Sequence, residues 1–138
     1  MRSGFGSVWM MAGSKLVPVN PADNTFSDNK LTGIVGAFRG IAIGEGAVWV
    51  PNVGTDTIHK FDPAVSTVKL TIPATTGDSE GSIGVGEGSV WVTEKQFLTR
   101  FNATSGKEEA KITLPGEGAG VKVAFGSVWI TSTRKNAL

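Results

Sequence analysis

The residues of this chain that could do chemistry are few and far apart. His59 is the only histidine, and there is no cysteine. A metal site needs several histidine, cysteine or carboxylate ligands close together, and no second histidine or acidic cluster accompanies His59. We therefore expect His59 to be a packed or edge side chain in the middle of a strand, and we predict no metal and no cofactor.

Serine nucleophiles and phosphate loops have little support. Ser7, Ser89 and Ser127 fall in predicted turns, and none has a histidine base near it in the sequence. The glycine-rich segments 44–46 and 116–120 lack the lysine and the following helix of a phosphate-binding loop. We interpret both segments as turns.

The charge distribution excludes two classes of partner. Lys and Arg number 13 and Asp and Glu number 12, and the two signs are interspersed. Nucleic-acid binding requires a basic stripe, so we expect no nucleic-acid partner. The apolar runs are of strand length, short of the roughly 20 residues that cross a bilayer, so we expect no membrane insertion. Residues 1–3 lead straight into the first repeat without an apolar signal segment, and the compartment stays unknown.

One motif recurs four times and contains every tryptophan of the chain. It reads Gly-x-Gly, then Ser or Ala, then Val-Trp-hydrophobic, and Ala124 replaces the first glycine in the fourth copy. The tryptophans, about 40 residues apart, are Trp9, Trp49, Trp91 and Trp129. A period near 40 residues that carries several short strands is typical of a β-propeller blade. Because the strands alternate with period two and no helical period is present, we predict an all-β chain.

Each repeat predicts up to four antiparallel strands, with the glycine-bounded strand innermost. In the two central repeats the expected strands are 40–44, 47–51, 57–61, 67–73, 81–86, 89–93, 97–101 and 110–115. The first repeat is expected to begin at a second strand, to contain an extended loop over 22–30 and to end with a fourth strand over 31–35. Glycine in the Gly-Glu-Gly and Phe-Gly segments predicts two-residue hairpin turns with positive φ.

The strand count predicts an incomplete ring. About 13 strands make three to three and a half blades, and propellers close with 4–8 blades. We therefore predict one partial β-propeller domain, residues 1–138, with repeats at about 4–43, 44–85, 86–123 and 124–138. Closure requires further blades of a longer chain or self-association into a homo-oligomer. In a dimer, residues 121–126 of one copy are expected to supply the innermost strand missing from residues 4–35 of the other.

The tryptophans are predicted to be structural. Their identical place in each repeat favours packing between neighbouring blades over an aromatic ligand platform. Trp49 and Trp91 are expected to be the most important, because Trp9 and Trp129 would lie at the open ends.

Polar side chains are predicted to meet at one mouth of the propeller channel. Loops that enter the innermost strands and loops between second and third strands share one face of a propeller. The six candidate ligand-binding residues there are Arg39, Glu80, Asn52, Asp56, Glu94 and Lys95. Charged and amide groups that converge on a funnel suit a small polar ligand or a peptide. The alternative is that they are solvated loop residues.

The repeats resemble those of known bacterial propellers. The motif, Phe-Asp-Pro-Ala at 61–64 and Leu-Thr-Ile-Pro at 70–73 are similar to repeats of YncE-like (YVTN-type) and streptogramin (virginiamycin B) lyase-like proteins. The resemblance covers nearly the whole chain and implies a propeller fold; full-length relatives are expected in the periplasm or outside the cell. It also implies a metal-assisted C–O elimination that uses channel-facing histidines and glutamates. The single His59 leaves no histidine pair, so no catalytic residue is carried over.

Two functions of different classes follow. The first hypothesis is a non-enzymatic binding or scaffold module that forms part of a propeller. The alternative is a partial or degenerate streptogramin-lyase-like enzyme. A third interpretation is a fragment without an independent role.

Overall fold

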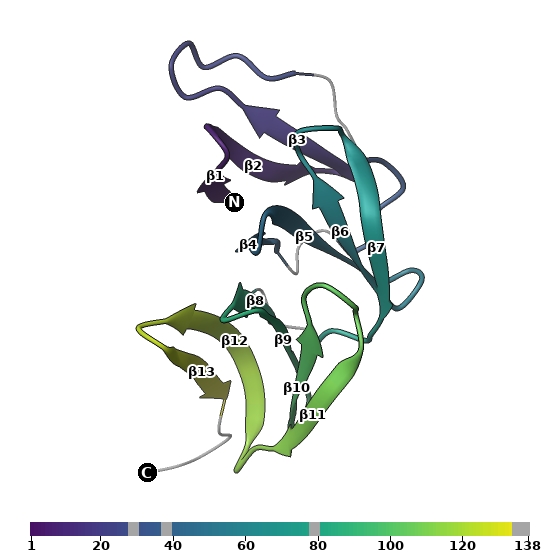
Figure 1. Ribbon diagram of the computed structural model, residues 1–138, viewed down its shortest axis with the longest axis vertical. Helices are drawn as coiled ribbons and strands as arrows, with labels where there is room; N and C mark the ends of the chain where they lie inside the picture. Colours follow the sequence, from purple (N-terminus) through teal and green to yellow (C-terminus); the bar gives the residue numbers. More distant parts are fainter. Residues whose placement is uncertain (28–30, 37–39, 78–80, 134–138) are drawn as a thin grey trace.

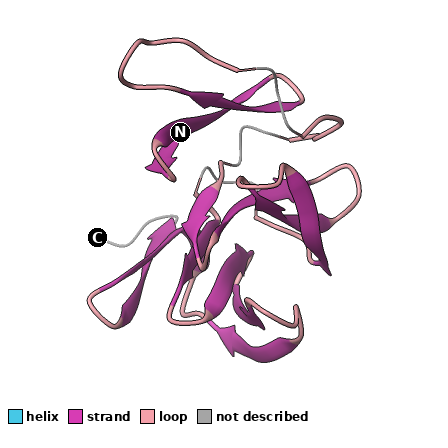
Figure 2. Ribbon diagram, turned by 45° about the horizontal axis from the view of Figure 1, so that its top comes forward, coloured by secondary structure: helices cyan, strands magenta, loops and turns pink. Residues whose placement is uncertain are grey.

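The computed structural model describes residues 1–27, 31–36, 40–77 and 81–133, and within them it contains strands and turns but no helix (Figures 1 and 2). The all-β prediction is confirmed. The strands are β1 (Arg2–Gly4), β2 (Ser7–Ala12), β3 (Lys15–Val19), β4 (Ala42–Gly44), β5 (Ala47–Asn52), β6 (Thr57–Asp62), β7 (Thr67–Pro73), β8 (Ile83–Gly86), β9 (Ser89–Glu94), β10 (Phe97–Asn102), β11 (Glu108–Thr113), β12 (Glu117–Ala124) and β13 (Ser127–Thr133).

The strands form four antiparallel sheets, each of which follows chain order. We call them the first blade (β1-β2-β3), the second (β4-β5-β6-β7), the third (β8-β9-β10-β11) and the fourth (β12-β13). The innermost strands β1, β4, β8 and β12 contact one another in that order. The sheets fan outward from these strands as an arc that is open on one side (Figure 1). Four-stranded antiparallel blades arranged in this way confirm the predicted propeller architecture.

Each blade begins with a two-residue hairpin. Glu45 and Gly46, at the tip of the second blade, have φ of 50° and 71°. The corresponding Phe-Gly and Glu-Gly tips of the other three blades have positive φ at both residues as well. Two successive positive φ values define the type I′ turn, whose twist matches that of the flanking strands. The glycine-based turn prediction is confirmed.

Alternation along each second strand gives a blade two different faces. In β5, Ala47 and Trp49 point to one side and Val48 and Val50 to the other, and all four are at most 1% exposed. We call the side that carries the motif tryptophan the Trp face. The side that carries the hydrophobic residues flanking that tryptophan is the valine face. Both faces of the second blade are buried because a neighbouring blade covers each of them.

The two cores show that the Trp face of one blade packs against the valine face of the next. Trp9 contacts Phe61 edge-on, with ring centroids 6.0 Å apart and an interplanar angle of 63°. The core between the first and second blades comprises Trp9, Leu16, Ile34, Ile41, Val48, Val50 and Phe61. The core between the second and third comprises Ala42, Ala47, Trp49, Ile58, Ile72, Ile83, Val90, Val92, Phe101 and Ala103. Each of these interfaces therefore uses a different face of its two blades, the Trp face of the earlier blade and the valine face of the later one.

The first blade differs from its prediction in three respects. The chain begins with an innermost strand, β1, which pairs with β2 from Arg2↔Trp9 to Gly4↔Ser7, so the prediction of a start at a second strand was wrong. The predicted fourth strand over 31–35 is also absent, and only the isolated bridge Leu16↔Leu31 remains there. Trp9 is only 3% exposed, because its face turns toward the second blade and not toward the open end.

The predicted mode of dimerisation was therefore wrong as well. Residues 121–126 were expected to fill an empty innermost position in the first blade of a partner. That position is occupied by β1, and β12 pairs within its own chain with β13, from Glu117↔Thr133 to Ala124↔Ser127. The first blade therefore has no empty strand position that a second copy could fill.

Candidate functional site

Of the six candidate mouth residues, the structure describes Asn52, Asp56, Glu94 and Lys95, and these four do not line one common hollow. Arg39 and Glu80 lie outside the described residues. Asn52 is 6% exposed, and its side chain bonds to backbone. Its Oδ1 accepts from the N–H groups of Val35 and Gly54 at 3.1 and 3.2 Å, and its Nδ2 donates to the Gly33 carbonyl at 3.4 Å. These bonds tie the segment before the second blade to its β5–β6 loop.

Two of the remaining candidates share a hollow between the second and third blades. Asp56 and Glu94 line a space of about 330 Å³ together with residues of the outer strands. The other lining residues are Pro73, Ala74, Thr75, Thr99, Phe101, Glu108 and Lys111. Lys95 does not line it; this exposed residue lies at the β9–β10 turn with φ of 51°, and its carbonyl accepts from the Gly118 N–H at 2.8 Å. The hollow lies on the outer part of the blades, away from the axis.

His59 lies in the middle of β6, the third strand of its blade, as expected. Its Nδ1 is 3.1 Å from Thr71 Oγ1, and its Nε2 is 3.5 Å from Thr57 Oγ1. Burial lowers the pKa of His59 below its usual value of 6.5, because the surroundings disfavour the charged ring. The neutral imidazole bonded to hydroxyl groups fits a packed side chain.

No group of three or more His, Asp or Glu side chains that could hold a metal ion occurs among the described residues. None of these residues belongs to a helix long and apolar enough to cross a membrane.

The four innermost strands enclose a different hollow, which lies at the axis. It has a volume of about 200 Å³ and is lined by Arg2, Ser3, Ala42, Ile43, Ile83, Gly84, Val85, Val121, Lys122 and Val123. We call it the axial groove. Each innermost strand pairs with one neighbour only, so its second backbone edge faces the groove without a partner strand. Such an edge offers N–H and C=O groups for recognition.

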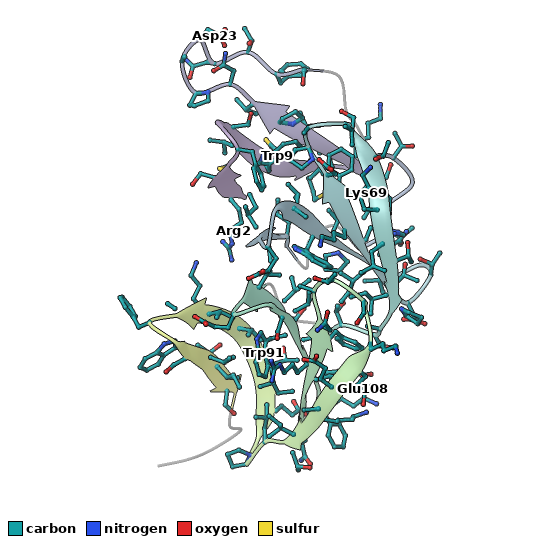
Figure 3. The ribbon with its side chains drawn as sticks, in the orientation of Figure 1. Arg2, Trp9, Asp23, Lys69, Trp91 and Glu108 are labelled. Carbon is teal, nitrogen blue, oxygen red and sulfur yellow. The ribbon has the colours of Figure 1, made fainter. Side chains whose placement is uncertain are left out.

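The axial groove is basic. Its only ionisable lining side chains are Arg2 and Lys122, and no carboxylate lines it among the described residues. Arg2 projects from β1 toward the concave side of the arc (Figure 3). Neither cation has a carboxylate partner among the ion pairs of the described residues, where Arg100 bonds to Glu109 at 3.1 Å.

Arg2 and Lys122 occupy the same place in their blades, and sequence reasoning missed both. Arg2 is opposite Trp9 in the β1–β2 register, and Lys122 is opposite Trp129 in the β12–β13 register. The two middle blades have a small residue there, Ala42 or Gly84. Aligning the repeats on their tryptophans and reading the residue seven positions earlier identifies this pattern.

Comparisons with known proteins agree with this architecture. No protein-family model and no curated protein matches the sequence. Solved structures that match are β-propellers: the chain shares the fold of virginiamycin B lyase and of AztD over most of its length, at low sequence identity. The similarity is thus one of fold.

The individual matches are as follows. A catalytically inactive virginiamycin B lyase from Staphylococcus aureus with quinupristin matches with a TM-score of 0.72 and 17% identity, over 96% of this chain and 47% of that one. Apo AztD from Citrobacter koseri matches with a TM-score of 0.68 and 14% identity, over 95% and 37%. Kuenenia stuttgartiensis hydrazine synthase matches with a TM-score of 0.57 and 12% identity, over 67% and 28%. The chain spans less than half the length of each of these structures.

Proposed function

We propose that this chain is a propeller-type binding module that takes a small anionic group in the axial groove. The observation that carries the proposal is the pair of cations at equivalent blade positions, Arg2 and Lys122, which line one hollow without a carboxylate beside them. An anion in this hollow would be attracted by both cations.

The rest of the groove favours the same class of ligand. Its walls are short aliphatic side chains and the backbone edges of the innermost strands, which have no partner strand on the groove side. The Val121 N–H already donates to the Gly81 carbonyl at 2.8 Å, so N–H groups other than this one would have to serve a ligand. A volume of about 200 Å³ accommodates a carboxylate- or phosphate-bearing group rather than a drug-sized molecule, for which pockets of about 300–1,000 Å³ are usual. The proposed ligand is therefore a small anion or the anionic end of a larger molecule.

Titration with inorganic phosphate, observed by amide NMR shifts, tests the proposal. We expect shifts at Ile43, Gly84 and other groove residues, and we expect them to weaken as salt is added. Arg2→Gln combined with Lys122→Gln should abolish them. Lys69→Gln is the matched control, because Lys69 is an exposed cation on the outermost strand β7 (Figure 3). Shifts that persist in the double variant, or that centre on the outer hollow, would contradict the proposal.

The alternative function is a streptogramin-lyase-like activity. The fold match to the lyase with quinupristin, at a TM-score of 0.72, is the observation in its favour. Its test is incubation with quinupristin and a divalent cation, followed by chromatography for the ring-opened product. Turnover by the purified chain would support the alternative, and the absence of ring-opened product would contradict it.

A further inference from the structure

The two ends of the arc carry the two halves of a blade interface. At the fourth blade the Trp face is uncovered, and Trp129 is 59% exposed, whereas Trp9 and Trp49 are 3% and 0% exposed. At the first blade the valine face is uncovered, and it carries the half-exposed side chains of Val8, Met10, Val17 and Val19. At the interfaces of the first with the second blade and of the second with the third, a Trp face packs against a valine face.

We propose that a second copy of this chain covers both ends. The Trp face of the fourth blade of each copy packs against the valine face of the first blade of the other. Two such head-to-tail contacts, related by a two-fold axis along the propeller axis, close a ring of two copies. This inference shares Ser3 with the axial groove, but it is argued from the two ends of the arc and does not require the proposed ligand.

Side-chain sizes on the innermost strands support the match of the two ends. At each internal interface, a glycine at the end of one innermost strand receives a branched side chain from the next. A Cβ on that glycine would lie 2.7–3.1 Å from the side chain. The three pairs are Gly4 with Ile43, Gly44 with Val85 and Gly86 with Val123. At the ends of the arc the same two positions hold Ala124 and Ser3. Ala124 is one methyl group larger than the glycine that it replaces, and Ser3 is smaller than the valine or isoleucine that it replaces. The two differences offset each other, so a contact between Ala124 and Ser3 would keep about the same volume as the internal pairs.

The hairpin tips show a second match. Phe5, at the tip of the first blade, lines a hollow with Pro63 and Ala64 from a turn of the second blade. Phe125, at the tip of the fourth blade, is 97% exposed and has φ of 54°. A bulky residue at that φ is unfavourable, and here it gains no packing within the chain.

The first blade carries the turn that such a phenylalanine contacts. Asn20-Pro21-Ala22 repeats Asp62-Pro63-Ala64, and in both turns the Asx side chain accepts from the alanine N–H, at 3.0 and 2.9 Å. The third blade has no proline at its corresponding turn, Asn102-Ala103-Thr104. The tip before it carries a glutamate, Glu45, whose Oε1 accepts from the Gly88 N–H at 3.0 Å. The Phe5 tip thus lies beside an Asx-Pro-Ala turn, and the first blade of another copy would offer the same kind of turn to Phe125.

The exposed tryptophan already has the conformation of the buried ones. Trp129 Nε1 donates to the Ala124 carbonyl at 3.2 Å, as Trp9 and Trp49 donate to the carbonyls of Gly4 and Gly44 at 3.0 Å. The ring thus presents apolar surface without an unsatisfied donor. Two copies supply eight innermost strands, within the range of 4–8 blades in which propellers close.

A disulfide trap tests the geometry, and the absence of cysteine from the chain makes it unambiguous. In the internal pairs the two Cβ positions are 3.1–3.8 Å apart, close to the roughly 3.5–4.5 Å of a disulfide. The double variant Ser3→Cys with Ala124→Cys should therefore oxidise to a covalent dimer. Each single variant, and the control pair Ser3→Cys with Thr113→Cys on the outer strand β11, should stay monomeric on a non-reducing gel.

Other gel patterns overturn the proposal. A ladder of higher species indicates an open head-to-tail chain, a dimer of either single variant indicates a symmetric contact, and an uncrosslinked double variant indicates that the ends do not meet. A second measurement needs no cysteine: light scattering of the unaltered chain should give the mass of a dimer. Trp129→Glu should give a monomer with an unchanged circular dichroism spectrum, because this side chain is 59% exposed in the single copy. A monomeric unaltered chain, or a dimeric Trp129→Glu variant, would refute the ring.

Discussion

The same substitution at two equivalent tryptophans should have unequal effects. Trp49 Nε1 donates to the Gly44 carbonyl at 3.0 Å. Trp91 Nε1 is buried and has no hydrogen-bond partner among the described residues. A cation lies over each ring at a similar distance, Lys60 at 5.2 Å from Trp49 and Arg100 at 5.3 Å from Trp91. Trp49 is 0% exposed whereas Trp91 is partly exposed, so replacement by phenylalanine removes both an indole hydrogen bond and more buried surface at Trp49 than at Trp91.

The magnitudes follow from surface area and hydrogen bonding. The change from indole to phenyl removes on the order of 40 Å² of apolar surface, which is about 1 kcal/mol of unfolding free energy. Trp49→Phe also leaves the partly buried Gly44 carbonyl without its donor, which costs about 1–2 kcal/mol more. Trp91→Phe loses no hydrogen bond and removes a buried donor that has no partner. We expect losses of about 2–3 kcal/mol for Trp49→Phe and about 1 kcal/mol or less for Trp91→Phe.

Guanidinium unfolding followed by far-ultraviolet circular dichroism measures the difference. Both variants should be compared at one low protein concentration, because association with a second copy stabilises the folded chain by mass action. Trp129→Phe is the exposed control and should change stability by less than either. Equal losses at Trp49 and Trp91 would refute the reasoning, since they would show that the Gly44 hydrogen bond contributes nothing measurable.

Three further changes test particular contacts. Asn52→Ala removes the anchor of the segment before the second blade and should cost about 1–3 kcal/mol in a denaturant melt; Asn52→Asp should not rescue this loss, because it buries a charge and places an oxygen against the Gly33 carbonyl. Gly46→Ala places a methyl group at φ of 71° with no atom within 4 Å, so a thermal melt should show a purely conformational loss of about 1 kcal/mol. Because the pKa of His59 is lower in the fold than its unfolded value near 6.5, the unfolded chain binds the proton more readily, and stability should fall as pH drops below about 6.5. His59→Gln should flatten that decline between about pH 7.5 and 5.5, and an unchanged slope would refute this role.

The central blades were predictable because local signals and burial agree there. The strand predicted over 67–73 coincides with β7, and the one over 57–61 differs from β6 by one residue. Apolar alternation, a tight turn and a buried position all favour the same structure in these segments. Because the glycine-based turns have φ values that few other residues adopt readily, they fix the hairpin registers as well.

The first blade was harder to predict because its sequence lacks those signals. β1 consists of Arg2, Ser3 and Gly4, none of which has a strong preference for strands, and it forms because the type I′ turn folds it back onto β2. The segment after β3 contains apolar residues, but Ile34 is buried in the core with no regular strand around it. Its Gly33 and Val35 are bonded to Asn52 instead.

The candidate mouth residues stay a prediction, and Asn52 shows why ligand-binding loop positions are hard to choose from sequence alone. A loop position was treated as exposed and available for a ligand, yet Asn52 is buried and bonded to backbone. The axial residues Arg2 and Lys122 occur on strands, where a charged side chain normally signals a solvated face. Only the arrangement of the innermost strands around the axis brings them into one hollow.

The residues that differ from the repeat at the two ends of the arc indicate what covers those ends. In the middle of the arc, glycine faces valine at the innermost contact and a glutamate tip bonds to the next glycine, since both partners lie in the same chain. At the ends, alanine, serine and phenylalanine replace those residues at equivalent positions. If the two ends did not meet, nothing would link the size of the residue at position 124 to that at position 3. If they face each other, the larger alanine and the smaller serine are coupled by close packing, and a substitution at one end should be compensated at the other. A Ser3→Val variant should thus weaken the dimer, and Ala124→Gly should restore it in the same chain.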